Sequence, residues 1–531
     1  MLSPRTVDLR IDARWVVPVE PAGVLADHAL IVDGGRIVAV LRATDADRDY
    51  RASTHVTLPD HVLIPGLVNA HTHAAMTLLR GVADDVPLKP WLEQQIWPRE
   101  ARLVAPDFVH DGTLLGAAEM LRGGITCCND MYFYPDAAAR AYEKAGMRAM
   151  LGMPILDFPT PYAADADAYI ARGLAARDMF KYAARLSFSL APHAPYTVSD
   201  ATWSTIVMFA RQLDLPIQTH VAETKAEVDD AIAATHETPL ARLDRLGATG
   251  PAFIAIHAVH LDAGDIDRLA THGCHVVHCP GSNMKLASGI APIGALLARN
   301  VNVALGTDGA ASNNRLDLFG EMRLAGLLAK VATGDAAVVP AATALRMATL
   351  NGAIALGLEG EIGSLETGKQ ADVTAVRIAD VETLPMYDPV SHLVNAALGT
   401  DGAASNNRLD LFGEMRLASL LAKVATGDAA VVPAATALRM ATLNGAIALG
   451  FEGEIGSLEI GKQADVTAVR IADVETLPMY DPVSHLVNAA GREHVTDVWV
   501  AGDRVVEAGQ VTTLDVTALC SRAHAWQQRI A

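Results

Sequence analysis

The chain has 531 residues and carries 61 Asp and Glu against 42 Lys and Arg, a formal net charge of −19. This acidic balance argues against nucleic acid or an anionic membrane surface as a partner. The sequence has no uninterrupted apolar stretch of about 18 residues, which argues against a membrane-spanning helix.

The first residues of the chain and the spacing of its cysteines indicate the cellular compartment in which we expect the protein. Residues 1–5 lead straight into a strand-like segment, without the basic and apolar parts of a secretory leader. The five cysteines show no spacing typical of a disulfide framework. Both features favour a reducing, cytoplasmic location.

Strands and helices are predicted to alternate along most of the chain. Short strands at 7–11, 28–32 and 36–40 come first, with a turn at 33–35. Helical stretches such as 111–122 then alternate with apolar runs, which number eight if the strand before His71 is counted. The other seven runs lie near Thr126, Met150, Phe188, Ile217, Ile254, Val276 and Val303. This alternation predicts an α/β fold, a (β/α)8 TIM-like barrel, which uses about 250 residues.

An internal duplication interrupts the pattern. Residues 304–396 recur as 397–489, with three differences: Gly326 against Ser419, Leu358 against Phe451, and Thr367 against Ile460. Solenoid repeats are shorter and more diverged. Near-identity instead indicates a recent duplication of the coding segment, or an error in assembling it. Removing one copy leaves 438 residues (531 − 93), so we expect one copy to have no place in the barrel fold.

Four side chains at strand ends predict a metal site. His71 and His73 are two residues apart on an extended strand, so both imidazoles point to one face. His220 and Asp308 each end a later apolar run. Three histidines and a carboxylate suit one Zn²⁺, or alternatively Fe²⁺, with a position open for water. The fourth strand ends at His193 rather than at a lysine that could bridge two ions, which favours a single metal.

The duplication offers a second aspartate for this site. Asp308 follows the β-rich run 301–305, in step with the preceding strand. Asp401 follows a weaker strand at 391–398, at the wrong distance along the chain. We therefore expect Asp308, rather than Asp401, to complete the metal site.

The first metal motif carries a family resemblance. The run Pro65-Gly66-Leu67-Val68-Asn69-Ala70-His71-Thr72-His73 resembles the entry motif of the amidohydrolase superfamily. Residues 74–81 and Trp91-Leu92-Glu93 resemble its methylthioadenosine/S-adenosylhomocysteine deaminase branch. This resemblance implies a barrel with a small β-sandwich domain built from both chain termini, to which strands at 371–376 and 495–506 contribute.

The resemblance and the duplication together predict five segments. They are the N-terminal part of the sandwich (1–64), the hydrolase barrel (65–363), sandwich strands of the first copy (364–396), the duplicate (397–489), and the final sandwich strands with a C-terminal helix (490–531).

The resemblance implies catalytic roles for three residues. Glu223 matches the family's general acid/base, which moves a proton from metal-activated water to a ring nitrogen of the substrate. His257 ends the sixth strand and matches a histidine that hydrogen-bonds the attacking water or the tetrahedral intermediate. Asp308 matches an aspartate that binds the metal and also accepts the water's proton.

Further residues match positions that contact a purine nucleoside. Glu100 corresponds to a carboxylate that accepts hydrogen bonds from ribose hydroxyls. By the same resemblance, we expect Trp91 to close over the nucleoside, His193 to touch the purine, and Glu223 and Asp308 also to face the substrate. The segment 282–286 resembles the family too, without an assigned role.

The predicted function is hydrolytic deamination of 5′-methylthioadenosine to the inosine analogue and ammonia, with S-adenosylhomocysteine and adenosine as further candidates. Relatives that accept S-adenosylhomocysteine can place arginines at and after the third strand. Here 152–159 has none and the next is Arg172, so an uncharged methylthio tail is favoured over a buried, unpaired carboxylate. The alternatives are a related deaminase or chlorohydrolase acting on guanine or a triazine, or an inactive duplicated variant. The predicted partner is thus a small-molecule purine nucleoside, and a homo-oligomer is left open.

Overall fold

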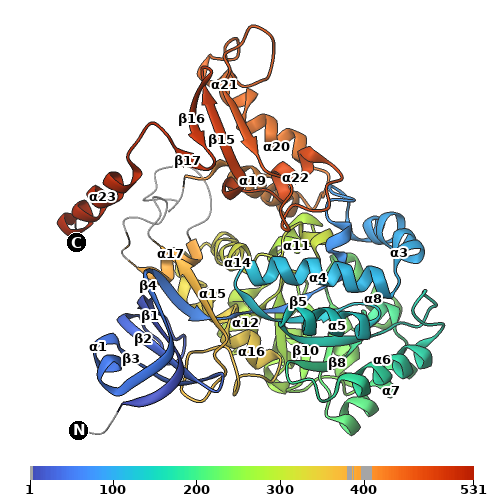
Figure 1. The fold of residues 1–531 in the computed structure, drawn as a ribbon. Helices are drawn as coiled ribbons and strands as arrows, with labels where there is room; N and C mark the ends of the chain where they lie inside the picture. The colour runs from blue at the N-terminus through green and yellow to red at the C-terminus, as the bar shows by residue number, and fades with distance from the viewer. Residues whose placement is uncertain (1–3, 379–385, 387, 396–408, 531) are drawn as a thin grey trace.

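Eight parallel strands form a barrel at the centre of the computed structural model, which describes residues 4–378, 386, 388–395 and 409–530 (Figure 1). The strands follow chain order: β5 (Leu67–Thr72), β6 (Ile125–Met131), β7 (Arg148–Ile155), β8 (Leu186–Pro192), β9 (Ile217–Val221), β10 (Phe253–His257), β11 (His275–His278) and β12 (Asn302–Leu305). The backbone N–H of Asp308 donates to the carbonyl of His71 at 3.1 Å, which links the end of β12 to β5. The predicted α/β barrel is confirmed.

Helices cover the outside of this barrel. Because both faces of a parallel strand are then buried, the strands read as nearly continuous apolar runs. The helices that alternate with the strands are α4 (Pro106–Arg122), α5 (Pro135–Ala145), α6 (Ala166–Phe180), α7 (Asp200–Leu213), α8 (Lys225–Thr235), α9 (Pro239–Arg245), α10 (Ala263–His272), α11 (Pro280–Lys285), α12 (Ile293–Ala298) and α14 (Leu318–Thr333).

A second, five-stranded sheet lies beside the barrel and combines four N-terminal strands with one strand that follows the barrel. Its order is β13-β4-β1-β2-β3, and β13 pairs with β4 in antiparallel register, with Val373 opposite Pro65. The bounds are β1 (Arg5–Val16), β2 (Leu25–Asp33), β3 (Arg36–Arg42), β4 (Tyr50–Pro65) and β13 (Val373–Arg377). The strand predicted at 371–376 therefore does join the N-terminal strands.

The last strands of the chain do not join that sheet, which corrects the expectation for 495–506. They form a separate sheet in the order β14-β15-β16-β17, with β14 (Val466–Val469), β15 (Val495–Val500), β16 (Asp503–Glu507) and β17 (Gln510–Val511). The physical reason is the duplication, because β14 repeats the sequence of β13 and offers β15 the same strand edge at a shorter distance along the chain.

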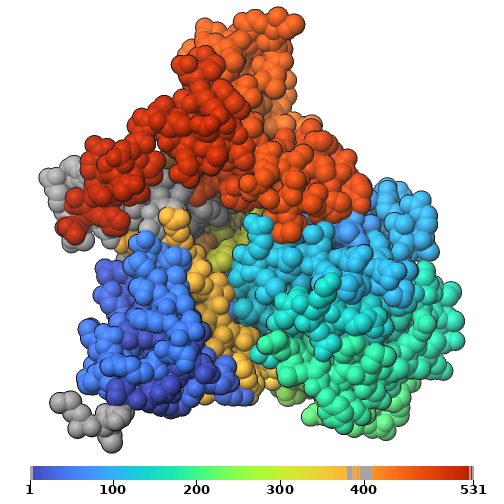
Figure 2. Space-filling view, in the orientation of Figure 1, coloured from blue at the N-terminus to red at the C-terminus, as the bar shows by residue number. Residues whose placement is uncertain are grey.

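The second copy forms a lobe with these strands, drawn in orange and red above the barrel in Figure 2. Its helices are α19 (Leu411–Thr426), α20 (Ala434–Ala441), α21 (Leu443–Leu449) and α22 (Pro482–Asn488). The lobe contacts the barrel side through apolar packing of α19 against α11 and α14. Polar contacts add to it, among them Lys423 with Asp85 at 2.5 Å and Tyr480 Oη with the carbonyl of Leu78 at 2.7 Å. Within the described part of the chain, a helix with the length and apolar character needed to cross a membrane was not found.

Candidate active site

The four predicted metal ligands converge at the carboxyl ends of the barrel strands. His220 Nε2 lies 3.3 Å from His73 Nε2, and Asp308 Oδ1 lies 3.4 Å from His71 Nε2 and 3.2 Å from His73 Nε2. Tetrahedral ligands about 2.0–2.1 Å from a zinc ion stand roughly 3.3–3.4 Å apart. These three separations are those expected between ligands of one cation.

The environment of the histidines also fits a cation. His71 is fully buried, and within the described residues neither of its ring nitrogens meets hydrogen-bond geometry. Burial lowers the pKa of His71 to about 3, so its imidazole is neutral and offers a lone pair. A buried polar atom without a partner is unfavourable, and a metal ion would supply a contact for Nε2, the nitrogen that faces Asp308.

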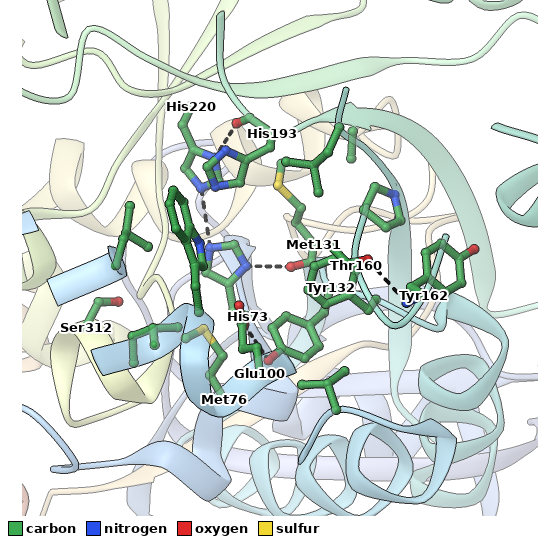
Figure 3. A pocket seen from close by; sticks show the side chains of 18 of the residues that line it. His73, Met76, Glu100, Met131, Tyr132, Thr160, Tyr162, His193, His220 and Ser312 are labelled. Carbon is green, nitrogen blue, oxygen red and sulfur yellow. Dashed lines mark hydrogen bonds between the residues drawn. The ribbon is translucent and has the colours of Figure 1, made fainter. Parts of the chain in front are cut away.

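Backbone carbonyls orient the other two histidines (Figure 3). His73 Nδ1 donates to the carbonyl of Met131 at 2.5 Å, and His220 Nδ1 donates to the carbonyl of His193 at 2.6 Å. With the proton held on Nδ1, each Nε2 is left as the ligand atom, which is the usual arrangement for a metal-binding histidine.

Asp308 is oriented by two hydroxyl groups that sequence reasoning missed. Ser282 Oγ and Ser312 Oγ each donate to Asp308 Oδ2 at 2.6 Å, which leaves Oδ1 facing His71 and His73. Burial would raise the pKa of Asp308, but these histidines hold it well below its usual range. The aspartate is therefore ionised and directed at the ligand cluster.

Glu223 lies beside the cluster, on the loop after β9. Its Oε2 is 3.8 Å from His257 Nε2, and its Oε1 accepts a hydrogen bond from Ser288 Oγ at 3.4 Å. Burial raises the pKa of Glu223 above its ordinary value. A carboxyl group whose pKa is raised in this way holds a proton more readily than an exposed glutamate, which suits a group that takes up and releases a proton.

A cavity of about 250 Å³ opens over these groups. The predicted substrate residues Trp91, Glu100 and His193 line it together with the metal ligands His73, His220 and Asp308. Figure 3 shows Glu100 directed toward Tyr132, whose Oη donates to Glu100 Oε1 at 2.7 Å. Sequence reasoning missed Tyr132 because its role depends on packing between two distant segments.

The chemistry of the cavity wall is mainly apolar and acidic. Met76, Leu92, Phe133, Leu156 and Phe158 are among the apolar side chains that line it. Among the described residues, its lining includes no lysine and no arginine. The lining therefore suits an uncharged organic ligand with hydroxyl groups better than an anionic one.

The predicted alternative ligand, Asp401, lies outside the described residues. All the other predicted site residues lie in or next to the cavity. His71 is enclosed beneath it, and His257 and Glu223 are on its wall.

A barrel with three histidines and an aspartate at its carboxyl-end face is typical of metal-dependent hydrolases. The chain matches the amidohydrolase family over residues 62–392 and 376–505. The chain belongs to this family and is a hydrolytic deaminase that acts on C–N bonds.

Relatives and solved structures agree with this assignment. The 5-methylthioadenosine/S-adenosylhomocysteine deaminase of Teredinibacter turnerae is 46% identical to the chain over 400 residues, which is 75% of this chain and 90% of that protein. The enzyme of the same name from Saccharophagus degradans is 46% identical over 396 residues, which is 74% of this chain and 89% of that protein. An adenosine deaminase from Xanthomonas campestris, solved with bound zinc, is 41% identical with a TM-score of 0.70 over 99% of both chains. Atrazine chlorohydrolase from Arthrobacter aurescens, at 20% identity and a TM-score of 0.69 over 98% of this chain and 100% of that one, shares the fold. The predicted membership of the methylthioadenosine/S-adenosylhomocysteine deaminase branch is confirmed.

Proposed function

We propose that the chain converts the 6-amino group of 5′-methylthioadenosine to a 6-oxo group and releases ammonia, with one Zn²⁺, or Fe²⁺, held by His71, His73, His220 and Asp308. The observation that carries this proposal is the grouping of His71, His73 and His220, with Asp308 Oδ1 within 3.4 Å of His71 and His73, beside an apolar cavity that Glu223 lines. The curated relatives named for this reaction support it.

A bound metal ion would act as a Lewis acid and lower the pKa of water to about 7. Glu223 takes one proton from the attacking water and delivers it to the adjacent ring nitrogen, while the water oxygen bonds to C6. Asp308 takes the remaining hydroxyl proton and passes it to the departing amino group. The C6–N bond breaks, ammonia leaves and a C6 carbonyl remains, so atoms and protons balance.

Three residues that line the cavity would bind the nucleoside part of the substrate. Glu100 is half-buried and already accepts one hydrogen bond from Tyr132, which leaves carboxylate lone pairs for the ribose hydroxyls. Trp91 is held by its indole N–H, which donates to the carbonyl of Ala83 at 3.1 Å, and its ring packs at the cavity wall. His193 lines the same cavity, where it would contact the purine.

The substrate tail is the finer part of the proposal. S-adenosylhomocysteine would bring a carboxylate into a cavity whose described lining has no basic side chain beyond the histidines. An unpaired charge in such a place is strongly unfavourable, whereas a methylthio group packs against the apolar wall. The chain should therefore prefer 5′-methylthioadenosine.

The test is ammonia release by the purified, metal-loaded chain from 5′-methylthioadenosine, S-adenosylhomocysteine, adenosine, guanine and a chlorotriazine. We expect the highest kcat/KM for 5′-methylthioadenosine, and Glu223→Gln should lower kcat by roughly 10²- to 10⁴-fold with the metal content unchanged. The exposed Glu143→Gln, on α5, is the matched control and should behave as wild type. Turnover of guanine or the triazine alone would contradict the proposed function, and a clear preference for S-adenosylhomocysteine would contradict the assignment of the tail.

A further inference from the structure

The segment after β11 resembles the family without an assigned role, and the structure shows where its side chains point. Helix α11 (Pro280–Lys285) is buried at all six of its residues, including the polar Ser282, Asn283 and Lys285. Buried polar side chains are almost always hydrogen-bonded. The partners of these three should therefore reveal what the helix does.

The partners of two of them are active-site groups. Ser282 Oγ donates to the metal-ligand candidate Asp308, as described above. Asn283 Oδ1 accepts a hydrogen bond from His257 Nδ1 at 2.8 Å. Both Asn283 and His257 are 1% exposed, so water cannot replace this contact.

This hydrogen bond determines which nitrogen of His257 carries the proton. A neutral imidazole has one donor nitrogen and one acceptor nitrogen. Because Nδ1 donates to Asn283, Nε2 presents its lone pair, and it points to the side of the cavity where Glu223 Oε2 lies 3.8 Å away. In this form Nε2 can accept a hydrogen bond from the attacking water and hold the water oxygen toward C6.

The backbone of His257 makes this side-chain contact more important. His257 has φ of +67° and the next residue, Ala258, has φ of +47°. Residues other than glycine rarely adopt this left-handed conformation, and they do so where surrounding contacts hold them. The hydrogen bond to Asn283 fixes the ring on top of this turn.

We propose that Asn283 is a positioning residue that sets the tautomer and the orientation of His257, which it does only as a hydrogen-bond acceptor. This inference rests on the proposed function. It gives the polar segment 282–283 a joint role, since one turn of α11 orients both Asp308 and His257. The side-chain amide nitrogen of Asn283 has no hydrogen-bond partner within the described residues, so the acceptor oxygen is the part of Asn283 that the site uses.

The experiment compares Asn283→Ala, which removes the acceptor, with Asn283→Asp, which keeps it. Loss of a residue that orients a catalytic histidine typically lowers activity roughly 10- to 100-fold, and we expect Asn283→Ala to lower kcat by this factor with KM for 5′-methylthioadenosine little changed. Asn283→Asp should recover most of the lost kcat. The matched control is Asn351→Ala, because Asn351 is also buried and donates to the carbonyl of Val303 at 2.9 Å, away from the cavity. It should lower the melting temperature and leave kcat unchanged, with metal content equal in all variants.

Three results would overturn the inference: wild-type kcat in Asn283→Ala, an Asn283→Asp variant as slow as Asn283→Ala, or an equal loss of kcat in Asn351→Ala. A wild-type chain that turns over no aminopurine would contradict the proposed function instead. Independently of activity, ¹⁵N NMR of the chain labelled with ¹⁵N-histidine reads the tautomer directly. The His257 signals are assigned by their loss in His257→Gln. A proton on Nδ1 that moves toward Nε2 in Asn283→Ala supports the inference, and a proton on Nε2 in wild type contradicts it.

Discussion

Where the structure describes both copies of the duplicated segment, they form equivalent helices in different surroundings. Helix α14 in the first copy and α19 in the second both span 16 residues. Each begins after an aspartate whose side chain accepts the N–H three residues on, Asp317 or Asp410, and each ends at a glycine with positive φ, Gly334 or Gly427. Local sequence is therefore sufficient to determine where these helices begin and end.

Burial, in contrast, depends on the partner. Leu318, Leu356 and Leu365 in the first copy are at most 3% exposed. Their equivalents Leu411, Leu449 and Leu458 are 49%, 70% and 82% exposed. The chain has one barrel and one N-terminal sheet to receive these side chains, and the first copy occupies both. The comparison teaches that an amphipathic pattern specifies a face to be buried but does not supply the surface that buries it.

The largest difference between the copies should appear when equivalent leucines are truncated. Leu365 packs in the core of the N-terminal sheet with Val16, Leu30 and Leu63. Leu365→Ala should lower the free energy of unfolding by about 2–5 kcal/mol, whereas the exposed Leu458→Ala should change it by less than about 0.5 kcal/mol. Urea unfolding measures both, and equal losses would show that Leu458, too, is packed in a core.

Equivalent glutamates should differ in their pH dependence. Burial raises the pKa of Glu321 to about 7 from an ordinary 4.5, so between these pH values the folded chain holds a proton that the unfolded chain has released. The stabilisation is complete below pH 4.5 and is lost as the pH rises, by about 3 kcal/mol at pH 7. Glu321→Gln should remove this slope from the stability profile, and the less buried Glu414→Gln should remove less of it. A profile unaltered by Glu321→Gln would contradict the burial of a proton at this site.

The serine that replaces glycine in the second copy, Ser419 against Gly326, should stabilise the first copy if it is introduced there. Ser419 Oγ donates to the carbonyl of Val432 at 2.7 Å, and a Cβ built on Gly326 would lie 3.6 Å from the equivalent carbonyl of Val339. Gly326→Ser should therefore fit and raise the free energy of unfolding by about 1 kcal/mol, through the hydrogen bond and the better helix propensity. Ser419→Ala should lose the bond in the second copy. A lower melting temperature for Gly326→Ser would show that the first copy has no room there.

The smallest effect on activity is expected from deleting 397–489. The deletion joins 396 to 490 and leaves β13 as the strand edge nearest in sequence to β15, so β15 should move to the N-terminal sheet. Metal content and kcat should match the full chain, because each described site residue lies before residue 313. Loss of activity would show that the second copy supports the site.

The sequence predicts the barrel and the metal ligands, because both are indicated by short apolar runs and the residues that end them. His71, His73, His220 and Asp308 each end an apolar run, and the carboxyl ends of barrel strands meet on one face. The resemblance marks the segment with Ser282 and Asn283 but gives it no role, and it does not indicate Tyr132, because the partners of these side chains are distant in the chain and no spacing indicates them. The pairing of β15 was predicted wrongly because the duplication offers two identical strand edges, and pattern alone does not choose between them.

The most direct test of the account measures bound metal in Asp308→Ala and Asp401→Ala beside the wild-type chain. We predict about one metal ion per chain in wild type and in Asp401→Ala, and a large loss in Asp308→Ala, since a three-histidine set then lacks its carboxylate. Metal lost only in Asp401→Ala, or retained in full by both variants, would contradict the claim that His71, His73, His220 and Asp308 share one cation.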